Sequence, residues 1–120
     1  MNINLEQAKR LWELGVRRKA SKAWYLEDIR DIWRLGKYHQ YKEGTYVARC
    51  SAYNAEELIS MMQGDYEIRL NADKTVDITV WYERYKGYDY FKGNTLTEAL
   101  CNKLIYDIEN GIITPEEINK

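Results

Sequence analysis

The chain has 120 residues, of which 45% are hydrophobic and 31% are charged. That length accommodates one domain with one hydrophobic core, and that composition excludes an intrinsically disordered chain. The net charge of −1 conceals an asymmetry, because residues 1–50 carry eleven basic and six acidic side chains (net +5), whereas residues 51–120 carry seven and thirteen (net −6).

The first predicted element is a helix that starts after Asn4 and ends at Gly15. Asn4 suits an N-cap, and Gln7 stands at the third position, as a capping box requires. Apolar residues recur at helical spacing on one face, namely Leu5, Ala8, Leu11 and Trp12. Gly15 tolerates the left-handed backbone that commonly ends a helix.

Residues 17–50 leave two interpretations open. Lys22 to Leu26 and Thr45 to Cys50 are rich in aromatic or β-branched residues, which favours strands. Four residues between or within these segments, Leu26, Ile29, Ile32 and Trp33, are spaced to share one face of a short helix. We expect a strand, then an irregular or helical turn, then a second strand.

A second helix is predicted after Asn54, with Glu57 completing its capping box and Gly64 ending it. Tyr53 and Leu58 flank the cap at the positions of a hydrophobic staple.

A strand pair follows, because apolar and polar residues alternate over residues 66–70 and 76–83. The intervening residues 71–74 (Asn-Ala-Asp-Lys) have the chemistry of a turn. A third strand is predicted over residues 88–91.

The third helix is predicted between Thr95, with Glu98 completing a capping box, and Gly111. Its apolar stripe includes Leu96, Leu100, Leu104 and Ile108. A last helical turn is expected after Thr114, with Pro115 first and Glu117 third.

Together these elements predict a single α+β domain spanning residues 1–120. We expect an antiparallel sheet of about four or five strands, with three helices packed mainly on one face. In this arrangement Leu100, Leu104 and Ile108 face a sheet surface that carries Ile68, Ile78 and Val80.

Catalytic and metal-binding motifs are not recognisable, so we expect a protein that is not an enzyme and has no cofactor or metal. The single histidine, His39, is interpreted as an exposed loop residue. Cys50 and Cys101 are far apart in the chain and are interpreted as free, partly buried thiols. An enzyme whose site combines scattered carboxylates remains an alternative.

The densest aromatic segment, residues 81–91, is the main candidate for a binding surface. Strand alternation places Val80 and Tyr82 on one face and Trp81 on the other. Three interpretations remain: packing in a two-sided core, a protein interface, or stacking on a nucleobase. The candidate binding residues in this segment are Trp81, Arg84, Tyr85, Tyr88 and Tyr90.

Arg17 and Arg18 form a second, basic candidate after the first helix. Cations there offset the helix dipole, which favours a solvated patch; docking on an acidic protein or a nucleotide phosphate is the other interpretation. Nucleic acid is disfavoured by the isoelectric point of about 5.9.

No signal peptide is readable at the start of the chain, and no apolar run approaches the roughly 18 residues that cross a bilayer. We therefore expect a cytoplasmic protein.

Two segments resemble a loose group of small proteins encoded by phages and prophages of gut bacteria. They are Ala52-Tyr-Asn-Ala-Glu-Glu-Leu58, and Thr97-Glu-Ala-Leu100 together with Lys103 to Ile112, and the resemblance covers residues 52–113. It implies an accessory protein that acts by binding, with a host defence component as the expected target, in the manner of an anti-CRISPR or other anti-defence inhibitor. A protein that sequesters a nucleotide signal is the alternative, and a second copy of the chain is a further expected partner.

Overall fold

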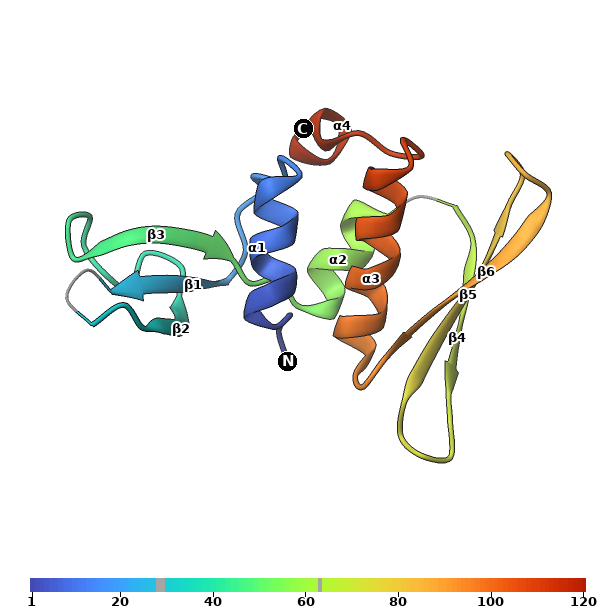
Figure 1. The fold of residues 1–120 in the computed structure, drawn as a ribbon, viewed down its shortest axis with the longest axis horizontal. Helices are drawn as coiled ribbons and strands as arrows, with labels where there is room; N and C mark the ends of the chain where they lie inside the picture. The colour runs from blue at the N-terminus through green and yellow to red at the C-terminus, as the bar shows by residue number, and fades with distance from the viewer. Residues whose placement is uncertain (28–29, 63) are drawn as a thin grey trace.

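The computed structural model describes residues 1–27, 30–62 and 64–120. Within these residues the chain has an α+β fold in which the helices lie between two antiparallel sheets (Figure 1). The helices are α1 (Leu5–Glu13), α2 (Ala55–Met61), α3 (Leu96–Glu109) and α4 (Pro115–Asn119). The strands are β1 (Lys22–Glu27), β2 (Trp33–Lys37), β3 (Tyr46–Ser51), β4 (Tyr66–Leu70), β5 (Val76–Tyr82) and β6 (Gly87–Gly93).

The strands are divided between two sheets, so the expectation of one sheet with four or five strands is wrong. The first sheet has the order β2-β1-β3 and the second the order β4-β5-β6. Each sheet is built from strands that follow one another in the chain, and α2 separates the two sets. α3 packs over one face of the second sheet, whereas α1 lies at one end of the first sheet, on the side of Trp24 and Trp33 (Figure 1). The opposite face of each sheet is here called its outer face.

The expected strands over 22–26 and 45–50 are confirmed as β1 and β3, but the turn expected between them contains the strand β2. In register, Trp24 pairs with Leu35 and Leu26 with Trp33, so these four side chains share one face of the first sheet. Trp33 and Leu35 thus follow strand alternation. Ile29, which also entered the helical interpretation, lies outside the described residues.

The helix starts are confirmed, but the capping boxes expected at Gln7 and Glu98 are incomplete. Glu98 Oε2 accepts a hydrogen bond from the Asn94 amide at 3.2 Å, and not from the amide of the cap residue Thr95. Asn54 and Thr114 each form a complete box with the glutamate three residues later. The Gln7 amide instead donates hydrogen bonds to the Glu98 carbonyl oxygen at 3.0 Å and to Asn102 Oδ1 at 2.9 Å. Gln7 therefore joins α1 to α3, because tertiary acceptors compete with the local cap.

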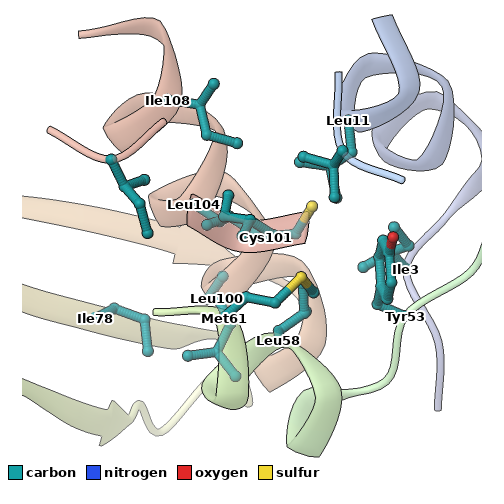
Figure 2. Packing of buried hydrophobic residues seen from close by; sticks show 14 of the residues in the cluster. Ile3, Leu11, Tyr53, Leu58, Met61, Ile78, Leu100, Cys101, Leu104 and Ile108 are labelled. Carbon is teal, nitrogen blue, oxygen red and sulfur yellow. The ribbon is translucent and has the colours of Figure 1, made fainter. Parts of the chain in front are cut away.

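The main core lies between α3, α2, α1 and the second sheet (Figure 2). Leu100 and Leu104 of α3 are completely buried, and Ile78 and Val80 of β5 are buried as well, as predicted. Ile68 shares the face of Ile78 but remains 50% exposed, so its predicted burial is wrong. The reason is that α3 packs over β5 and β6, leaving the edge strand β4 uncovered.

Candidate functional site

The outer face of the second sheet carries three large aromatic side chains. Trp81 of β5 lies opposite Tyr88 of β6 in the register, and Tyr90 lies opposite Thr79. The Trp81 and Tyr88 rings meet edge to face, with centroids 4.8 Å apart. Trp81, Tyr88 and Tyr90 are 45%, 61% and 70% exposed, and together we call them the aromatic face.

Charged residues occupy the other end of this outer face. In the register, Arg69 of β4, Asp77 of β5 and Lys92 of β6 lie side by side, two residues further along the strands than the row of Thr79 and Tyr90. Asn71 donates a hydrogen bond from Nδ2 to Asp77 Oδ2 at 3.0 Å. Glu67 of β4 lies opposite Thr79 on the same face, so two cations and two carboxylates lie next to the aromatic face.

Tyr85 and Arg84, two further predicted site residues, lie in the turn between β5 and β6 and point to the helix side. The Tyr85 ring lies 5.3 Å from the ring of the inward-facing Tyr82, and its hydroxyl is 3.1 Å from the Tyr106 hydroxyl of α3. Arg84 donates a hydrogen bond from Nη1 to the Asn110 carbonyl oxygen at 2.8 Å. This oxygen lies at the C-terminal end of α3, where the helix dipole stabilises a positive charge. The structure therefore separates these two residues from the aromatic face.

Arg17 and Arg18 lie after α1, while the second sheet lies on the other side of the helices (Figure 1). The Arg17 guanidinium stacks on the Trp12 ring at 3.6 Å and donates to the Trp12 carbonyl oxygen at 2.6 Å. Trp12 was predicted to lie on the apolar face of α1. Its ring packs against Arg17 instead of the core, and the residue is 42% exposed. The Arg18 carbonyl oxygen accepts hydrogen bonds from Ser51 and Tyr53, so its main chain joins the first sheet to α1.

A buried ionic cluster under the second sheet was not predicted from the sequence. Lys103 Nζ of α3 is 2.6 Å from Asp107 Oδ2, and these side chains are only 1% and 5% exposed. The Tyr82 hydroxyl donates to the other oxygen of Asp107. Lys103 and Asp107 are spaced i,i+4 beside the apolar stripe of α3. Two opposite charges at this spacing were the feature of the sequence from which the ion pair could have been predicted.

The ionic cluster borders a cleft of about 450 Å³ that is also lined by Asp65, Trp81 and Arg84. Burial raises the pKa of the Tyr82 phenol above its ordinary value, and the hydrogen bond to the Asp107 carboxylate raises it further. A phenol held in its protonated form is a hydrogen-bond donor at neutral pH and a poor base. The cluster therefore has the properties of a structural ion pair.

The remaining candidates for chemistry lie apart. His39 is exposed in the loop after β2, as predicted, and Cys50 and Cys101 are buried free cysteines. Burial raises the pKa of both thiols, which keeps them protonated and unreactive. Among residues 1–27, 30–62 and 64–120, no group of three or more His, Cys, Asp or Glu side chains is arranged to hold a metal ion.

None of the helices in the described part of the chain combines the length and the apolarity that crossing a membrane requires. Comparisons with protein-family models, with curated proteins and with solved structures found no match to this chain.

Proposed function

We propose that this protein acts by binding a protein partner through the aromatic face of its second sheet. The observation that carries the proposal is the exposure of Trp81, Tyr88 and Tyr90 on neighbouring strands, on the face that the helices leave uncovered. Tyrosine and tryptophan are the residue types that most often contribute binding energy at protein interfaces. Their rings bring large apolar areas at a small cost in conformational entropy.

The size of the outer face bears on how much of a partner it can contact. Strands about 4.8 Å apart, with residues about 3.3 Å apart along each strand, give this sheet a flat footprint of roughly 300 Å². Stable interfaces bury about 800 Å² of accessible surface on each partner, so a stable complex would also include residues beyond the sheet.

The charges on the outer face describe the chemistry of that partner. Arg69 and Lys92 are balanced by Asp77 and by Glu67, which lies opposite Thr79 in the register. A fitting surface presents apolar groups to the aromatic face and charges of both signs around it. That the partner is a host defence component follows only from the resemblance of residues 52–113 to phage proteins, and it stays a prediction.

Photo-crosslinking from the aromatic face identifies the partner. A benzophenone amino acid at position 90 should crosslink to one protein, and the same group at position 47, an exposed residue of β3 in the first sheet, should not. The purified partner is then titrated with wild type, Trp81→Ala and Tyr88→Ala. Each variant should lose about 2 kcal/mol of binding free energy, roughly thirtyfold in affinity.

Ile59→Ala is the matched control, because Ile59 is 43% exposed but lies on α2. Its affinity for the crosslinked partner should equal that of wild type. Equal affinities of wild type and Trp81→Ala would refute the proposal. A dimer of the wild-type chain in sedimentation velocity, abolished by Trp81→Ala, would assign the face to self-association instead.

A further inference from the structure

The outer face of the first sheet is covered by the chain itself. Residues 38–45, between β2 and β3, fold back over this face, and Gln40 Oε1 accepts a hydrogen bond from the Lys37 amide at 2.8 Å. A Cβ atom at Gly36 would lie 2.5 Å from Gln40 Oε1 and 3.5 Å from the Tyr41 ring. Glycine at position 36 thus permits the close approach of this cover.

The cover leaves open a cleft of about 660 Å³, lined by three tyrosine rings. Tyr25 of β1 is 1% exposed, and its hydroxyl donates to the Lys37 carbonyl oxygen at 2.8 Å, which holds the ring in place. Tyr41 and Tyr46 each meet it edge to face, with centroids 4.9 Å away. The volume lies within the range of small-molecule sites, about 300–1,000 Å³, which are typically aromatic with a few polar groups.

Among the described residues, two arginines and one glutamate are the charged groups that line the cleft. Arg34 of β2 lies opposite Tyr25 in the register and forms an ion pair with Glu27, and Arg30 lines the same cleft. Both arginines belong to the half of the chain whose net charge is +5. A planar guanidinium next to aromatic rings suits a phosphate attached to a flat ring system.

We propose that this cleft binds a nucleoside phosphate, with the base against Tyr41 and Tyr46 and the phosphate at Arg34 and Arg30. Tyrosine rings at steep angles beside a carboxylate would also suit a quaternary ammonium group. The arginines decide against that ligand, because Glu27 is already paired with Arg34 and a second cation would be repelled. This proposal is independent of the protein interface on the second sheet.

Calorimetric titration of the full chain with AMP, GMP, CMP and UMP tests the proposal, with inorganic phosphate and choline as further probes. At least one nucleotide should bind, and added salt should weaken it. Tyr41→Ala and Arg34→Ala should each lower its affinity by about tenfold or more. Glu27→Gln should not lower it, because this change removes a competing anion.

Tyr90→Ala and Arg69→Ala are the matched controls, since they remove an exposed tyrosine and an exposed arginine from the other sheet. Both should bind the nucleotide as wild type does. In the wild-type chain, the nucleotide should shift the ring NMR signals of Tyr41 and Tyr46 and not those of Tyr88 and Tyr90, a measurement that depends on no variant folding.

Three results would overturn the assignment. The first is the absence of binding by all of these nucleotides at millimolar concentration. The second is inorganic phosphate binding as tightly as the best nucleotide, which would remove the role of the tyrosines. The third is choline binding that Glu27→Gln abolishes, which would make the cleft a cation site.

Discussion

Each sheet has three antiparallel strands, in the order β2-β1-β3 in the first and β4-β5-β6 in the second, and their outer faces differ. Tyr25 and Trp81 occupy equivalent places, each on the outer face of a central strand. Tyr25 is 1% exposed, whereas Trp81 is 45% exposed. The first sheet is covered by residues 38–45 of its own chain, whereas the strands of the second sheet are joined by short turns that leave its outer face exposed among the described residues.

The comparison shows that an aromatic residue on a strand can be either a core residue or part of a binding surface. The length of the loop beside it decides between these two roles. A cover of several residues converts the outer face of the first sheet into a small second core with a cleft. The short turns between β4, β5 and β6 leave the aromatic face open, and contiguous exposed aromatics of this kind mark interaction surfaces. Stability and binding measurements can separate the two roles.

The largest effect is expected for Tyr25→Ala, because this ring is buried between Tyr41 and Tyr46. Truncating a buried aromatic residue costs about 3–5 kcal/mol of unfolding free energy. Urea denaturation of Tyr25→Ala and of the exposed control Tyr90→Ala measures the difference. Equal losses in the two variants would mean that the cover over the first sheet contributes nothing to stability.

A similar loss is expected when the ion pair under the second sheet is broken. Lys103→Met leaves the Asp107 carboxylate buried without its cation, which costs about 3–5 kcal/mol. Replacing both residues, in Lys103→Met with Asp107→Leu, should cost less than the single change, because no buried charge remains. A double variant less stable than the single one would contradict this account.

Leu104→Ala should cost about 2–5 kcal/mol, since the side chain is completely buried between α3 and the second sheet. Ile68→Ala is the comparison on the same sheet, at a half-exposed position, and we expect a loss below about 1 kcal/mol. Thermal and urea unfolding give both values. A loss below about half a kcal/mol for Leu104→Ala would mean that this face of α3 is not packed against the second sheet.

Alkaline pH should destabilise the junction between the first sheet and α1. Burial raises the pKa of Tyr53 from 10.0 to about 12, so the folded state keeps the proton that the unfolded state loses. This contribution is complete below pH 10 and is lost as the pH rises to about 12, amounting to roughly 2–3 kcal/mol. Unfolding free energies measured across this range should fall less steeply in Tyr53→Phe, whereas Tyr90→Phe, on the open face, should follow wild type.

The smallest effect on folding is expected for Trp81→Ala, below about 1 kcal/mol, because nearly half of this side chain is already in water. Circular dichroism and urea denaturation measure it on the same samples used for partner binding. A loss as large as that of Tyr25→Ala would show that Trp81 is a core residue and that the open face is not available for binding.

The local elements were predictable because their signals lie within a few residues. The caps at Asn54, Thr95 and Thr114 and the alternation in β5 require only neighbouring side chains, and all of these elements are present. The outward direction of Trp81 follows from the same alternation. The strand β2 was missed because its five residues hold few apolar positions and its pairing with β1 is a tertiary contact.

Amino-acid order alone did not predict which faces would be covered, because cover depends on contacts between distant residues. The exposure of Ile68 and the separation of Tyr85 from Trp81 follow from where α3 lies, and the division into two sheets appears only in the strand pairing. The cleft at Tyr25 exists because residues 38–45 return over Gly36. Period-two and helical patterns specify which side chains share a face, and only tertiary packing decides what that face meets.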